Sequence, residues 1–241
     1  MKFENIIKKI SGFLAAGVIF ILAATTYLKL KGFETGPDGK IVLVQGANAA
    51  MKTAMPTTQV DMREALPQNH VLGNPNAPVA IYEFSSLGCF HCQDFHVDLL
   101  PRLKEEFIDT GKVKLIFADF PLDKPSLKAS MLARCMPEDK YYDFLAMLFK
   151  KQGEWHRARN PEDVLLQFAA LDGLDVETAR QCLSDEKVEN ELMAIRQQGI
   201  DSFGIQGTPA LLVATREDRE VLNGLPGYAG LKEILDKALG N

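Results

Sequence analysis

Short apolar runs alternate with amphipathic stretches from residue 79 onward. Residues 79–84 form a β-branched and aromatic run bounded by turn residues, which predicts a buried strand. Apolar residues then recur at helical spacing from 89 to about 110, and Gly111 follows as a C-terminal stop. Residues 113–118 predict a second strand. A strand, a helix and a strand in this order predict a right-handed βαβ unit with parallel strands.

The segment that follows carries only helical signals. Prolines and N-capping residues begin several segments between 125 and 203, and Gly173 stops one of them, which predicts four or five helices. Residues 210–214 return to a strand pattern, and residues 228–239 predict a final helix. We therefore expect one α/β layer interrupted by a helical insertion at residues 123–203.

The N-terminal part has a different pattern. Residues 10–28 contain no charged side chain, and these 19 residues would form a helix of about 28 Å, enough to span a bilayer. Lysines precede this run, which favours a cytoplasmic N-terminus and export of the rest. Residues 1–31 are predicted to be a cleaved signal or, in preference, an uncleaved membrane anchor. Residues 32–69 are predicted to be a spacer with one short strand at its far end.

The composition narrows the class of protein. The chain has 241 residues, of which 46% are hydrophobic and 24% charged, a globular balance that excludes a disordered chain and a many-span membrane protein. Four cysteines are too few for a disulfide scaffold in a chain of this length. The formal net charge is -5, residues 32–241 alone carry -9, and no Lys/Arg-rich stretch occurs. Nucleic acid is therefore not an expected partner.

The motif Cys89-Phe90-His91-Cys92 lies just after the first strand, where a helix is predicted to begin. Unpaired backbone N–H groups and the helix dipole favour an anion at this point, so Cys89 is predicted to be the attacking thiolate and Cys92 the resolving thiol. His91 can stabilise that thiolate further. Phe90 is either a packing residue or an apolar contact for a client chain.

An alternative interpretation of this motif is a zinc site built from Cys89, Cys92, His91 and His96. We favour it less, because His91 lies between the two cysteines and no second CxxC or HxxxH pair occurs at the usual spacing. No metal and no cofactor are therefore expected.

Two further features surround the motif. Glu83 lies in the predicted buried strand, where a carboxyl group is costly unless it is hydrogen-bonded or protonated, and we predict that it moves protons for Cys92. The alternative is an acid at the strand edge that reaches solvent. Thr208-Pro209 precedes the strand at 210–214; a cis bond there would present the backbone of Thr208 to an extended client, but the sequence does not reveal the isomer.

These motifs, in this order over residues 70–240, resemble the DsbA-like branch of the thioredoxin superfamily. The resemblance implies a thioredoxin-like α/β fold at 70–122 and 204–241 with the inserted helical domain between them. It also implies that Cys89 and Cys92 are the redox pair, that His91 tunes Cys89, that Pro209 is cis, and that Glu83 is the buried acid. Similar proteins have a second disulfide, for which Cys135 and Cys182 are the candidates; free buried thiols are the alternative.

Two departures from the family pattern stand out. Phe90 replaces the proline common between the cysteines of the oxidase branch, and no basic partner for Glu83 is evident, since the second strand carries Phe117 at that level.

The resemblance implies a periplasmic thiol-disulfide oxidoreductase that introduces disulfide bonds into reduced exported proteins and is reoxidised by a membrane partner of the DsbB type. It would be held at the inner membrane by residues 10–28 or released after signal cleavage. The alternatives are a reductase or isomerase of the same fold, or a redox-inert peptide-binding module.

Overall fold

The computed structural model describes residues 33–35, 41–43 and 70–240. Within the predicted spacer, β1 (Phe33–Thr35) pairs antiparallel with β2 (Ile41–Leu43). No helix in the described part of the chain has both the length and the apolarity needed to cross a membrane. The predicted membrane segment, residues 10–28, lies outside the described residues.

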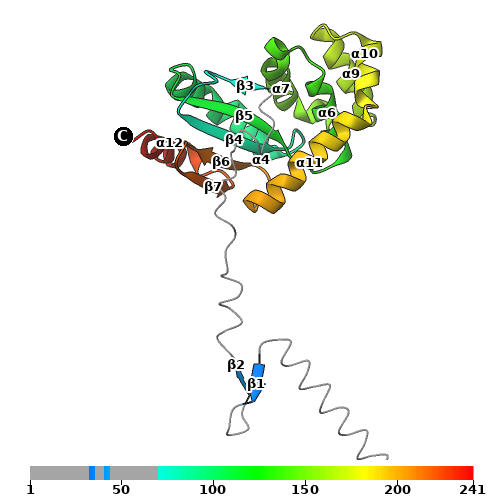
Figure 1. Cartoon of the computed structure of the whole chain (residues 1–241). Helices are drawn as coiled ribbons and strands as arrows, with labels where there is room; N and C mark the ends of the chain where they lie inside the picture. Colours follow the sequence, from blue (N-terminus) through cyan, green and yellow to red (C-terminus); the bar gives the residue numbers. More distant parts are fainter. Residues whose placement is uncertain (1–32, 36–40, 44–69, 241) are drawn as a thin grey trace, which may run out of the picture. The chain divides into compact units, whose positions relative to one another are not determined.

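A five-stranded sheet organises residues 70–240 (Figure 1). Its order is β3-β5-β4-β6-β7, and β4 and β5 are parallel as predicted, whereas the other pairs are antiparallel. The strands are β3 (Val71–Leu72), β4 (Val79–Ser85), β5 (Val113–Asp119), β6 (Ala210–Ala214) and β7 (Arg219–Asn223). The sequence did not predict β7, because this edge strand is largely solvent-exposed and has no apolar run.

The segment after β4 is not the single regular helix that was predicted. It consists of α4 (Phe90–Asp94), the π-helical turn η1 (Phe95–Leu99), α5 (Leu100–Leu103) and a second π-helical turn, η2 (Lys104–Ile108). Pro101 has no N–H to donate to the carbonyl one turn earlier, which disfavours regular α-helical bonding at the first of these turns.

The helices between β5 and β6 outnumber the prediction of four or five. Six α-helices and the 3-10 turn η3 (Glu138–Lys140) occur in this described segment. The helices are α6 (Lys124–Arg134), α7 (Tyr141–Lys150), α8 (Gln152–Trp155), α9 (Pro161–Leu171), α10 (Val176–Leu183) and α11 (Glu186–Phe203). The short helix α8 was below the length at which a periodic pattern is recognisable. After the last strand, α12 (Gly227–Ala238) is the predicted final helix.

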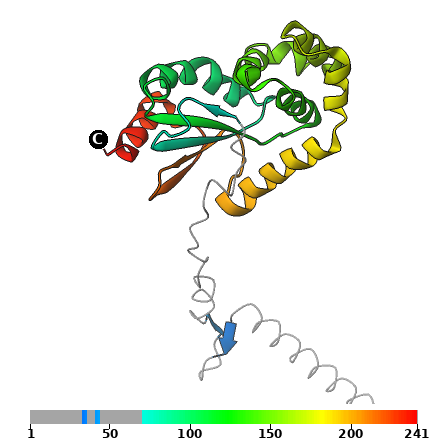
Figure 2. The ribbon, with the colours of Figure 1, turned by 45° about the horizontal axis from the view of Figure 1, so that its top comes forward.

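All seven residues of β4 are buried, and because successive side chains of a strand point to opposite sides, both faces of the sheet are covered at this strand. Val79 and Ile81 pack with apolar residues from the α4–η2 segment and α12, whereas Tyr82 and Phe84 pack with residues of α11. Figure 2 shows these helices on the two sides of the sheet. On the α11 side the fit is tight: a Cβ at Gly199 would lie 2.8 Å from Phe84 Cε1.

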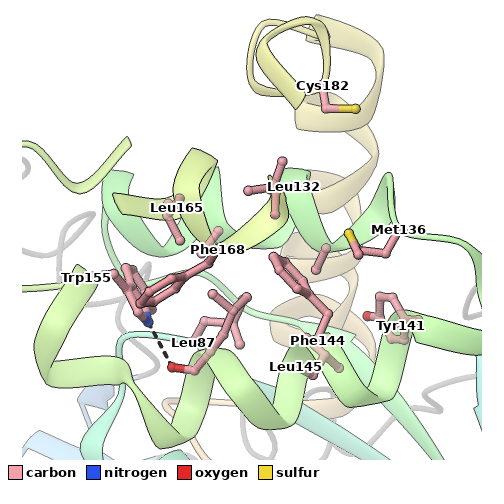
Figure 3. Packing of buried hydrophobic residues seen from close by; sticks show 14 of the residues in the cluster. Leu87, Leu132, Met136, Tyr141, Phe144, Leu145, Trp155, Leu165, Phe168 and Cys182 are labelled. Atoms are coloured by element: carbon pink, nitrogen blue, oxygen red, sulfur yellow. Dashed lines mark hydrogen bonds between the residues drawn. The ribbon is translucent and has the colours of Figure 1, made fainter. Parts of the chain in front are cut away.

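A third cluster lies inside the helical segment (Figure 3). Trp155 and Phe144 are fully buried in it, and Trp155 Nε1 donates a hydrogen bond of 2.8 Å to the Leu148 carbonyl oxygen. Leu87, two residues before Cys89, belongs to the same cluster. The packing of the helices therefore reaches the loop that carries Cys89.

A disulfide joins Cys135, at the end of α6, to Cys182 in α10, across 47 positions of sequence. The cross-link restricts the unfolded chain, so replacing both cysteines by alanine is expected to lower the free energy of unfolding by about 2–4 kcal/mol. Urea unfolding of the oxidised wild type and the double variant measures this. An unchanged unfolding midpoint and slope would contradict the expectation.

Candidate active site

Cys89 is the N-cap residue of α4 and follows directly on the loop that leaves β4. Its backbone N–H donates to the Ser86 carbonyl oxygen at 2.9 Å, which shapes the turn into the helix. From α8, the side chain of Gln152 donates to the carbonyl oxygens of Leu87 (2.7 Å) and Cys89 (3.0 Å). The helical segment thus holds the cysteine loop from one side by hydrogen bonds as well as by apolar packing.

The two sulfurs have opposite environments. Cys89 is partly exposed, Cys92 is buried, and both are free thiols in this structure. A hydrogen bond from Cys92 is the main cause that lowers the pKa of Cys89 from its ordinary value of 9.0 to about 5; Thr208 and the backbone N–H groups of Cys92 and His91 add to the effect, and burial opposes it. Burial, followed by the hydrogen bond to Cys89 and the charge of Glu83, strongly raises the pKa of Cys92. The outer sulfur therefore ionises first.

The segment before β6 approaches the outer sulfur. Cys89 Sγ donates to the Thr208 carbonyl oxygen at 3.4 Å, although the two residues are 119 positions apart. The Thr208-Pro209 peptide bond is cis. The Thr208 hydroxyl is buried and has no partner in the described part of the chain. It is thus a hydrogen-bond donor available beside Cys89 when the thiol loses its proton.

Glu83 has a basic partner, contrary to the prediction that none is evident. His96 Nε2, in the π-helical turn η1, lies 2.8 Å and 3.1 Å from the two carboxylate oxygens of Glu83. The alternative of a strand-edge acid reaching solvent is wrong, because the Glu83 side chain is 0% exposed. The sequence signal for this partner is the histidine in the predicted helix after the cysteine motif, which the alternative zinc interpretation uses as a ligand.

The other two residues of the motif point to solvent. The His91 side chain is 76% exposed and its Nδ1 lies 3.4 Å from Asp94, so the contact of His91 with Cys89 is through its backbone N–H and not through the ring. Phe90 is 62% exposed, which is unusual for a phenylalanine. A shallow pocket lies beside it, lined by Gly88, Phe90, Gln93, Gln152, Gly153, His156 and Arg157.

The four residues of the alternative zinc site do not converge. His91 turns toward Asp94 and His96 toward Glu83, so neither ring faces the sulfurs. Over the described ranges, no cluster of three or more histidine, cysteine or acidic side chains could hold a metal ion.

The fold and this cysteine arrangement define a thioredoxin-like protein, and comparison with known proteins agrees. A family model described as thioredoxin matches residues 65–237, and the chain belongs to this family. The predicted thioredoxin-like fold is thus confirmed.

Several proteins with similar sequences are named as enzymes or proteins of disulfide bond formation. A Rickettsia bellii protein named as a protein-disulfide oxidoreductase is 30% identical over 68% of this chain and 61% of its own length. Disulfide bond formation protein D of Bacillus subtilis is 26% identical over 78% of this chain and 85% of its own. The chain spans 61%, 63% and 66% of the first three rickettsial relatives that it matches.

Solved structures give the same picture. The crystal structure of α-DsbA1 from Wolbachia pipientis is similar with a TM-score of 0.65 and 32% identity, covering 73% of this chain and 92% of that one. Oxidised BdbD from Bacillus subtilis is similar with a TM-score of 0.64 and 26% identity, covering 74% and 95%. The resemblance to DsbA-like proteins is therefore confirmed.

Proposed function

We propose that this protein is a thiol-disulfide oxidoreductase that oxidises other proteins by passing them the Cys89–Cys92 disulfide. The observation that carries the proposal is the pairing of a partly exposed sulfur, whose pKa is lowered to about 5, with a buried sulfur three residues later. A stabilised thiolate favours the reduced form of the pair, so its disulfide is a strong oxidant.

The reaction follows from which sulfur is accessible. A client thiolate attacks Cys89 Sγ of the oxidised protein, the Cys89–Cys92 bond breaks, and Cys92 leaves and takes up a proton, for which Glu83 is the nearby acid. A second client thiolate then attacks the client sulfur of the mixed disulfide and releases Cys89 as a thiolate. The client loses two electrons and gains a disulfide, and the protein becomes a dithiol.

Client binding would use the surfaces next to Cys89. The backbone at Thr208 lies beside the reacting sulfur and can hydrogen-bond an extended client segment. The exposed Phe90 ring and the pocket beside it offer further apolar and polar contacts. A role of the His91 ring in tuning Cys89 stays a prediction.

Disulfide formation fits an oxidising compartment such as the periplasm, with residues 10–28 as signal or inner-membrane anchor and a DsbB-type membrane protein as the oxidant. Residues 70–122 and 204–241 would form the thioredoxin-like domain, and residues 123–203 the helical insertion.

Alkylation and equilibration with glutathione test the proposal. We expect iodoacetamide to modify Cys89 of the reduced protein at pH 6, with a rate that falls only as the pH drops through about 5, because thiolate is the reacting form. In Cys92→Ala the main stabilising hydrogen bond is lost, so this midpoint should move to higher pH. The glutathione equilibrium should give a potential well above that of thioredoxin.

The outcomes separate the alternatives. A thioredoxin-like potential would favour a reductase, and a separate assay for reshuffling of scrambled disulfides tests isomerase activity. Absence of exchange with glutathione, or an alkaline alkylation midpoint for Cys89, would favour a redox-inert peptide-binding module and overturn the enzymatic proposal.

A further inference from the structure

We propose that His96 is a positioning residue that keeps the Glu83 carboxylate ionised and oriented while Cys92 is a thiol, so that the carboxylate can accept the Cys92 proton. The inference rests on the proposed function, since it concerns the step in which Cys92 gains or loses its proton. It assigns a role to a histidine that lies outside the cysteine motif and contacts neither sulfur.

The geometry of the pair supports this role. One nitrogen, His96 Nε2, is within hydrogen-bond distance of both Glu83 oxygens, at 2.8 Å and 3.1 Å. Both side chains are buried, with exposed fractions of 2% for His96 and 0% for Glu83. A buried N–H donor that serves both oxygens favours the charged carboxylate over the neutral acid.

The surroundings hold the imidazole ring in this position. It stacks on Phe149 of α7 with ring centroids 4.0 Å apart and an interplanar angle of 19°. Phe95 and Phe117 contact it edge to face at 5.5 Å and 5.9 Å. Phe117, which occupies the strand position next to Glu83, therefore packs against the imidazole ring of the histidine and is not a polar partner of the acid.

Other groups near Glu83 cannot replace the histidine. Its neighbours across the sheet are Phe117 on β5 and Leu211 on β6, both apolar. The titratable groups that face it from α4 and α7 are Cys92, Tyr141 and Tyr142, and none of them is a cation. Over the described ranges, His96 is the basic side chain paired with this carboxylate. Without it, burial alone favours the neutral acid, which cannot accept a proton.

The step in question is the closure of the Cys89–Cys92 disulfide from a mixed disulfide. The Cys92 thiol gives its proton to the Glu83 carboxylate, and the resulting thiolate attacks Cys89 Sγ. The disulfide bond between Cys89 and the other partner of the mixed disulfide breaks, and this partner leaves as a thiolate that carries the electron pair. The protein is oxidised by two electrons and the leaving thiol is reduced; His96 takes no direct part in the proton transfer.

The full-length reduced protein, mixed with oxidised glutathione, provides the test. Acid quenching and mass spectrometry follow the glutathione adduct on Cys89 and its resolution by Cys92 between pH 5 and 9. His96→Phe keeps an aromatic ring for stacking but removes the donor. We expect it to slow resolution at pH 7 by about tenfold and to move the pH profile to higher pH. His96→Gln retains an N–H donor and should recover most of the rate.

A matched background shows whether His96 acts through Glu83. In Glu83→Gln, where no carboxylate can form, adding His96→Phe should cause no further slowing. Additive effects of the two substitutions, or an unchanged pH profile in His96→Phe, would overturn the inference. If the wild type forms no adduct at all, the proposed function fails instead.

A direct measurement of the Glu83 protonation state complements the kinetics of the variants. A buried protonated carboxyl group gives a characteristic carbonyl band in the infrared spectrum. At pH 7 the spectra of the reduced wild type and of reduced Glu83→Gln should not differ in such a band, because Glu83 is ionised in the wild type. Observation of that band in the wild type, with its loss in Glu83→Gln, would show that Glu83 is neutral and would overturn the inference.

Discussion

Replacing Cys89 by serine is expected to abolish disulfide exchange, with the rate at which reduced client proteins gain disulfides falling by a factor on the order of 1000 or more. Cys89 is the sulfur that the structure leaves accessible, whereas Cys92 is buried. A serine oxygen has nearly the same size but cannot form the mixed disulfide. Oxidative refolding of a reduced client with two cysteines measures the effect.

Cys92→Ser is the matched control for this prediction. It removes the buried sulfur, so the variant should still attack oxidised glutathione or a client disulfide through Cys89 but should accumulate the mixed disulfide. The two variants thus separate attack from resolution. Equal reactivity of Cys89→Ser and the wild type, or accumulation of the adduct on Cys92, would show that the roles of the two sulfurs are wrongly assigned.

Arg134→Met is expected to lower the free energy of unfolding by about 3–5 kcal/mol. Asp119, at the end of β5, is 1% exposed, and Arg134 of α6 binds it through both Nε, at 3.0 Å, and Nη2. Removal of the guanidinium leaves a buried carboxylate without its ionic partner. Methionine fills much of the same volume, so the loss measures the missing charge more than a cavity. Urea unfolding at neutral pH gives the value.

A second variant tests the cause. Asp119→Leu combined with Arg134→Met removes both charges, and most of the lost stability should return, because replacing a whole buried ion pair by apolar groups is often close to neutral. If the double variant is as unstable as the single one, packing and not the unpaired charge is the cause.

Much of the candidate site was predictable because its signals are local. The strand at residues 79–84, the cysteines at a helix start and the proline before the strand at 210–214 can each be recognised from neighbouring residues. The partner of Glu83 could not be found in this way. His96 is 13 residues away in the π-helical turn η1, and it meets the carboxylate where this turn packs against the sheet.

The sequence by itself determined the strand-helix-strand order and the position of the cysteine pair at a helix start, because apolar periodicity and residue chemistry act over a few neighbouring positions. It also predicts an export segment near the N-terminus and a redox role for the two cysteines. Only the tertiary structure decided which sulfur is accessible, which carbonyl lies beside Cys89, and how the buried acid is paired. Each of these is a contact between segments distant in sequence, formed when the helices close over the sheet and water leaves, and burial of that kind then shifts the ionisation of the groups it encloses.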